Sequence, residues 1–197
     1  MIDICTISLT ETATLKIDKK EVMRYLRTKE MDEGLNAIYE ACVKRIYEVA
    51  SPKAVYKKFN INVLDNIVDF GFMKVNSKDL AKNLKDCNEA YAFAATLGIG
   101  ADRTFDRLNR VSQTEATVFS AVASSLIESF CDYVNERLID GLSSKPRFSA
   151  GYGDFSLEHQ RDILSNLEAD KRLGIFLTES YMMVPVKSVT AIIGIRS

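Results

Sequence analysis

The residues of this chain best suited to binding chemistry are one glutamate and one arginine. Glu128 is the only charged residue between Ala116 and Cys131. Arg147 follows in the sequence KPRFSAGYGDFSLEH, residues 145–159, which has neither a helical nor a strand period. An arginine binds a carboxylate through paired hydrogen bonds, and a carboxylate attracts a cation. Beside an aromatic ring, this pair could hold a zwitterionic amino-acid group that carries a ring.

The loop around Arg147 contains further groups that suit a ligand. Phe148 and Tyr152 offer flat surfaces, and Gly151 and Gly153 let the backbone approach a ligand without a Cβ in the way. The alternative is a structural loop whose arginine forms a salt bridge to the body of the protein. Composition alone favours that alternative.

A long helix, predicted over 114–141, must position Glu128. Its core stripe is apolar, whereas the opposite face is small, and a helix that is apolar or small all round is generally buried all round. Glu128 is therefore predicted to be a buried carboxylate that needs a partner. A structural ion pair and a solvent-facing side chain are the alternatives to a ligand site. The stripe is Phe119, Val122, Leu126, Phe130 and Tyr133, and the small face is Thr117, Ala121, Ser124, Glu128 and Cys131.

The other elements alternate without a regular strand–helix–strand order. This pattern predicts a single α+β domain over residues 1–197, with a mixed or antiparallel twisted sheet and several helices. Strands are predicted at 3–12, 54–63, 66–75, 89–100 and 188–197, and helices at 19–27 (capped by Asp18), 31–49, 78–87 (capped by Ser77), 101–112 and 156–174 (capped by Ser156).

Composition narrows the class of protein. The 197 residues include 26 basic and 27 acidic ones, so a net charge of −1 gives no reason to expect a nucleic-acid partner. No apolar run approaches the ~18 residues of a membrane span. The N-terminus lacks the pattern of a signal peptide, which predicts a cytoplasmic protein. The four cysteines are far apart and there is one histidine, which predicts reduced, mostly buried thiols and no metal site.

Three other motifs are weak, and no catalytic residue is predicted. Ser156 and His159 have no third residue to orient them. The sequence LGIGAD, residues 97–102, lacks the Lys-Ser/Thr of a phosphate loop. The polar residues Thr178, Glu179 and Ser180 stand between apolar runs and form either a turn or the wall of a site.

The two segments PRFSAGYGDFSLEH and LGIFLTESYMMVPVKSVTAIIG together resemble the activation domain of vitamin B12-dependent methionine synthase. That family has an Arg-x-x-x-Gly-Tyr segment, a helix, and then a Gly-Ile/Met-x-Leu-Thr-Glu-Ser segment followed by Met, Pro and Ser-Val. The matching residues are Arg147, Gly151, Tyr152, Gly174, Ile175, Leu177, Thr178, Glu179, Ser180, Met183, Pro185, Ser188 and Val189.

The resemblance implies a domain that binds S-adenosylmethionine and presents it to cobalamin. In the family, inactive cob(II)alamin takes one electron from a flavodoxin-like donor and is then methylated. The family's ligand-binding glutamate falls on Glu128 and its arginine on Arg147, with a backbone contact at Ser149. Motif positions Gly151, Tyr152, Thr178, Glu179 and Ser180 complete the expected ligand-binding set.

The chain also departs from the family pattern. It has no tryptophan, Ile192 and Ile193 stand where the family has an aromatic stretch, and AGYGDFS replaces PGYPACP. We therefore expect a free-standing, shortened form that acts in trans on a cobalamin-dependent methionine synthase or another corrinoid protein that holds the cobalamin. Whether it counts as an enzyme component stays open. The alternative is a module that docks on a corrinoid protein without binding S-adenosylmethionine. An open cleft beside Arg147 favours the first interpretation, and a cleft filled by Phe148 and Ile193 favours the second.

Overall fold

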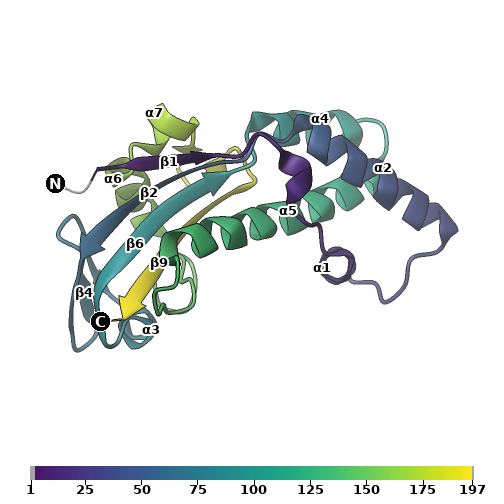
Figure 1. The fold of residues 1–197 in the computed structure, drawn as a ribbon. Helices are drawn as coiled ribbons and strands as arrows, with labels where there is room; N and C mark the ends of the chain where they lie inside the picture. The colour runs from purple at the N-terminus through teal and green to yellow at the C-terminus, as the bar shows by residue number, and fades with distance from the viewer. Residues whose placement is uncertain (1–2, 197) are drawn as a thin grey trace.

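A four-stranded antiparallel sheet forms the centre of the protein (Figure 1). The computed structural model describes residues 3–196. The strand order is β1-β2-β6-β9, so β9, the last strand of the chain, is an edge strand of this sheet. The strands are β1 (Cys5–Ser8), β2 (Lys53–Asn60), β6 (Cys87–Thr96) and β9 (Ser188–Arg196).

Both faces of this sheet are covered, which explains the long buried runs of β6 and β9. Neighbouring side chains alternate between two hydrophobic clusters: Phe93 and Ile193 belong to one, and Ala92, Ala94 and Ile192 to the other. Three alanines of β6, Ala90, Ala92 and Ala94, lie in the second cluster.

The first cluster packs the sheet against the longer helices. The apolar residues of α5 and α2 belong to it, and the figure shows α5 running along the sheet and beyond it toward α1, α2 and α4. The helices on this side of the sheet, with the short 3₁₀ turn η1 that precedes them, are η1 (Thr12–Thr14), α1 (Lys19–Tyr25), α2 (Glu33–Val49), α4 (Ile99–Asn109) and α5 (Gln113–Ile139).

The second cluster lies on the other face and is built from shorter elements. Their bounds are β3 (Asn62–Leu64), β4 (Ile67–Asp69), β5 (Lys74–Asn76), α3 (Lys78–Asn83), η2 (Leu157–His159), α6 (Gln160–Asn166), α7 (Ala169–Leu173), β7 (Phe176–Leu177) and β8 (Met183–Val184). The predicted cap of α3 is confirmed, since the Ser77 hydroxyl accepts a hydrogen bond from the N–H of Leu80.

The single helix predicted over 156–174 is wrong. The chain forms a 3₁₀ turn and two short helices, and Glu168 adopts a left-handed conformation with φ of 49° between them. Ser156 makes no side-chain cap. The break lets Ile163, Leu167 and Ala169 all bury in the second cluster, which one straight helix of this length would not do.

The strands predicted at 54–63 and 66–75 are also each divided. The first becomes β2 and β3, separated by the buried Ile61. The second becomes β4 and β5, because Gly71 turns the chain with φ of +80° and its N–H is bonded by the Asp69 carboxylate at 2.8 Å. The predicted class, an α+β fold with antiparallel sheets and several helices, is confirmed. No helix within residues 3–196 is long and apolar enough to cross a membrane.

Candidate functional site

The open edge of β9 creates the site. The first residues of the segment 145–159 run antiparallel to β9. The N–H of Lys145 donates to the carbonyl of Gly194, and Phe148 and Ile192 exchange two backbone hydrogen bonds of 2.9 and 2.8 Å. After Phe148 the chain leaves the strand and turns on itself, with the N–H of Gly151 bonded to the carbonyl of Phe155. The edge of β9 from Ser188 to Thr190 is left facing a cleft.

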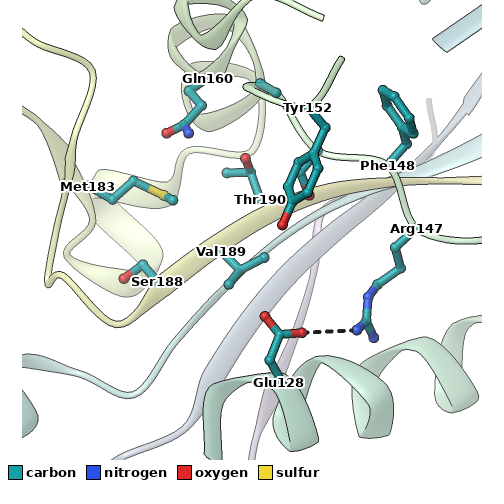
Figure 2. Close-up of a pocket in the computed structure, with 11 residues that line it drawn as sticks. Glu128, Arg147, Phe148, Tyr152, Gln160, Met183, Ser188, Val189 and Thr190 are labelled. Carbon is teal, nitrogen blue, oxygen red and sulfur yellow. Dashed lines mark hydrogen bonds and ion pairs between the residues drawn. The ribbon is translucent and has the colours of Figure 1, made fainter. Parts of the chain in front are cut away.

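The cleft has a volume of about 360 Å³ and straddles this strand edge. Glu128 approaches from α5 on one side, and Gln160 from α6 on the other, with Val189 and Thr190 between them (Figure 2). The lining residues are Glu128, Arg147, Phe148, Ser149, Ala150, Tyr152, Gln160, Met183, Ser188, Val189 and Thr190.

The predicted pairing of Glu128 with Arg147 is present. The Arg147 Nη2 lies 3.3 Å from the Glu128 Oε2, and its Nη1 lies 2.6 Å from an Asp132 oxygen. The Glu128 side chain is 42 % exposed, because it projects into the cleft. The prediction of a buried carboxylate is therefore wrong, although most of α5 around it is buried.

Partial burial still affects this carboxylate. Desolvation raises the pKa of Glu128 above its ordinary value, and the nearby Arg147 guanidinium opposes that shift without cancelling it. A cation placed against Glu128 would act as Arg147 does, by lowering the pKa and favouring the charged carboxylate. The cleft thus contains a carboxylate whose environment favours the arrival of a positive group.

Ser124, on the small face of α5, contacts a lysine from the segment before β9, while Ala121 and Cys131 of the same face belong to the first cluster. The Lys187 ammonium donates to the hydroxyls of Ser124 at 2.8 Å and Ser120 at 3.1 Å. Burial lowers the pKa of Lys187, and the Asp102 carboxylate opposes that shift. Asp102 also accepts a hydrogen bond from the N–H of Val186 at 2.8 Å. These bonds fix the chain that leads into the cleft at Ser188.

The loop that carries Arg147 and Tyr152 is anchored by Asp154. Its carboxylate accepts hydrogen bonds from the Ser77 hydroxyl and from the N–H groups of Lys78 and Asp79, at the start of α3. The hydrogen bond from Ser77 is the main reason that the pKa of Asp154 is lowered. Gly153 lies directly against Asp79, where a Cβ would be 2.2 Å from its carboxylate oxygen. The AGYGDFS sequence thus serves to dock the loop.

The structure divides the predicted site residues between two places. Glu128, Arg147, Ser149 and Tyr152 line the cleft, with Gly151 in the turn next to it. Thr178 and Glu179 line a separate groove of about 550 Å³ beside α6, α7 and β7. Ser180 is exposed in the β7–β8 turn, where its hydroxyl is 3.0 Å from that of Thr178.

Sequence reasoning missed Asp132 and the Gln160–Thr190 side of the cleft. Asp132 lies one helical turn after Glu128, so the i, i+4 spacing was an available signal. Nothing local marks Gln160 or Thr190, because two distant segments bring them together. The His159 Nδ1 lies 3.3 Å from an Asp162 carboxylate oxygen, and only the backbone N–H of His159 bonds Ser156, at its carbonyl. Within residues 3–196, no group of three or more His, Cys, Asp or Glu side chains could hold a metal ion.

Comparison with known proteins identifies the class of fold. The chain resembles a solved crystal structure of the MetH reactivation domain bound to AdoHcy, with a TM-score of 0.67. The match covers 98 % of this chain and 78 % of that chain, at 15 % sequence identity. No protein-family model matches the sequence, and neither does any curated protein. The fold is therefore that of a methionine synthase reactivation domain, as the sequence motifs predicted.

Proposed function

We propose that this protein binds S-adenosylmethionine in the cleft beside Glu128 and Arg147 and presents it to a cobalamin-dependent methionine synthase in trans. The observation that carries the proposal is the paired Glu128 and Arg147 in an open cleft, on a fold like that of the AdoHcy-bound MetH reactivation domain. Phe148 lines the cleft without filling it. Ile193 does not line the cleft and is buried in the first cluster, against α5.

Each of the two charged residues has a role that follows from its position. The Arg147 guanidinium binds the ligand carboxylate, and Glu128 binds the ligand amino group or sulfonium. Phe148 and Tyr152 form a wall of the cleft, and Tyr152 is 67 % exposed before any ligand arrives. The protein contributes positioning. Once a flavodoxin-like donor had supplied one electron, the cobalamin held by the partner would accept the methyl group, and S-adenosylhomocysteine would remain in the cleft.

An apolar rim beside the cleft supports docking on a protein partner. Phe176, Met182, Val184 and Val186 are all exposed, and Phe176 pairs with Val184 in the β7–β8 hairpin. Met183 of the same hairpin lines the cleft. Because neighbouring strand residues point to opposite faces, a partner that contacts Phe176 and Val184 would lie on the face of the hairpin away from Met183. This feature also fits the second candidate function, a docking module that binds no S-adenosylmethionine.

Calorimetric titration with S-adenosylmethionine, with and without the partner synthase, separates the two. We expect binding by the wild type, and a loss of at least about tenfold in affinity for Arg147→Ala and for Glu128→Gln. Because both groups are partly exposed, Arg147→Ala should lower the free energy of unfolding by only about 1 kcal/mol or less. Glu179→Gln is the matched control, since it lies in the other groove and should bind normally.

Two results would count against the proposal. Absence of ligand binding in both titrations leaves the docking module as the better candidate, and equal affinity in all the variants places the ligand elsewhere. A reactivation assay with oxidised synthase should parallel the titration, with Glu179→Gln active and Arg147→Ala inactive.

A further inference from the structure

The side of the cleft away from Glu128 and Arg147 contains polar groups that the protein itself does not satisfy. Gln160 is 7 % exposed and Thr190 is 2 % exposed. Within residues 3–196, the Gln160 Oε1 and the Thr190 Oγ1 are buried without a hydrogen-bond partner. Both residues line the cleft, and in Figure 2 they lie on the opposite side of Val189 from Glu128.

Unsatisfied buried polar groups are costly, so a pair of them in one cleft needs an explanation. Ser188, two residues before Thr190 in β9, shows the contrast. Its hydroxyl donates to the Pro185 carbonyl at 2.7 Å and accepts from the Thr96 hydroxyl at 2.8 Å. The cleft therefore combines a satisfied polar residue, fixed by the protein, with two whose partners the protein does not supply.

The backbone of Thr190 adds two more groups. In an antiparallel ladder, the N–H and C=O of alternate residues point to the same side. Ile192 exchanges both of its bonds with Phe148 on the outer edge, and the Gly194 carbonyl bonds Lys145 there. Thr190 lies two residues before Ile192, so its N–H and C=O face the same outer edge. Its register partner on the inner side, Ala94, does not bond these two groups. At the outer edge the loop has already left the strand.

We infer that Gln160 and Thr190 form a subsite for the hydrogen-bonding edge of a neutral planar base, of the adenine class. This inference rests on the proposed function and deepens it. The subsite offers an acceptor, a donor, a hydroxyl and a side-chain amide, with no charged group among them. Adenine presents an amino donor beside ring-nitrogen acceptors, which a Gln amide and a backbone N–H/C=O pair can match. The carbonyl of Thr190 only accepts, so it disfavours a base with an oxo group in place of the amino group.

Two ligands and three variants test the subsite. The ligands are S-adenosylhomocysteine and S-inosylhomocysteine, which differ by the amino or oxo group of the base. Gln160→Met and Thr190→Val keep the side-chain volumes and remove the polar atoms. Asn166→Leu is the matched control, because Asn166 Oδ1 is also buried without a partner within residues 3–196 but does not line the cleft.

We expect the wild type to bind the adenosyl ligand at least about tenfold more tightly than the inosyl ligand. Gln160→Met and Thr190→Val should each lose about tenfold in affinity for the adenosyl ligand, with an unchanged or higher melting temperature. Asn166→Leu should keep its affinity. A subsite that only supported the fold would instead lose melting temperature together with affinity, and this result would overturn the inference.

The remaining outcomes separate this inference from the proposed function. If Glu128→Gln weakens binding while Gln160→Met and Thr190→Val bind like the wild type, only the subsite is wrong. The same conclusion follows if the wild type does not distinguish the two ligands. If the wild type binds neither ligand, both proposals are wrong.

Discussion

Arg147 is shared between two carboxylates of α5, and its shorter contact is with Asp132, not with Glu128. The Asp132 side chain is 67 % exposed, so it contributes little to stability. A ligand carboxylate must compete with Asp132 for the same guanidinium. We therefore predict that Asp132→Asn raises the affinity for S-adenosylmethionine by a few-fold, measured by calorimetry. Weaker binding would show instead that Asp132 holds Arg147 in its binding orientation.

The raised pKa of Glu128 predicts two opposite pH dependences. The folded protein holds this proton more tightly than the unfolded chain, whose value is near 4.5, so the contribution of Glu128 to stability falls as the pH rises through the raised pKa. Affinity for a cationic ligand changes the other way, because protonation removes the attracting charge as the pH falls through the same pKa. Titrations and melting curves from pH 4.5 to about 7 should show both trends, and Glu128→Gln should remove them.

The charged half of the site was predictable from the sequence, and the neutral half was not. Glu128 stood out because a lone charge in an apolar helix needs an explanation, and Arg147 because of the residues around it. The exposure of Glu128 was misjudged, since the helix pattern does not reveal that the β9 edge is open beside it. Gln160 and Thr190 look ordinary in their own segments, and only the pairing of strands makes them neighbours.

Among the elements, the start of α3 is linked to the ligand loop through Asp154. We predict that Asp154→Ala lowers the melting temperature and weakens S-adenosylmethionine binding, although Asp154 does not line the cleft. Ser77→Ala removes the bond to Asp154 and the cap of α3 on the Leu80 N–H, and should cost about 1 kcal/mol of unfolding free energy, with a smaller effect on binding because Lys78 and Asp79 still bond Asp154. Because the pKa of Asp154 is lowered, its stabilisation is present above the ordinary pKa and lost as the pH falls through the lowered one.

The comparison of variants decides this prediction. If Asp154→Ala lowers the melting temperature and leaves the affinity unchanged, the loop keeps its shape without its anchor. Thermal denaturation and calorimetry on the same samples provide both measurements.

Elements with a strong period were predicted well, and those set by tertiary packing were not. The long helix α5 and the apolar strand β9 begin and end within two residues of their predicted bounds where described. The segment 156–174 has a helical composition throughout, yet it breaks at Glu168 to bury apolar residues on both sides of the break. A pattern read along one segment contains no information about the surface on which that segment must pack.

For the whole molecule, the central sheet belongs to both hydrophobic clusters. Ile192 and Ile193 are adjacent, completely buried, and point into opposite clusters. If residues 1–197 form one domain, as the sequence predicts, Ile192→Ala and Ile193→Ala should each cost about 2–5 kcal/mol and shift one common transition. Circular dichroism and tyrosine fluorescence should then give coincident curves. Separate transitions that respond to only one of the two variants would indicate two units.

The point at which the ladder beside β9 ends has an evolutionary consequence. Ala150 is the next residue that would face Thr190 if the pairing continued past Phe148. Two more residues of pairing would occupy the backbone of Thr190 and move Ser149 and Ala150, which line the cleft, without any substitution. A lineage could abandon the ligand through a change of turn alone, while its glutamate and arginine stayed in place. Descendants of such an event would carry the same signature residues, and the length of one ladder would tell them apart.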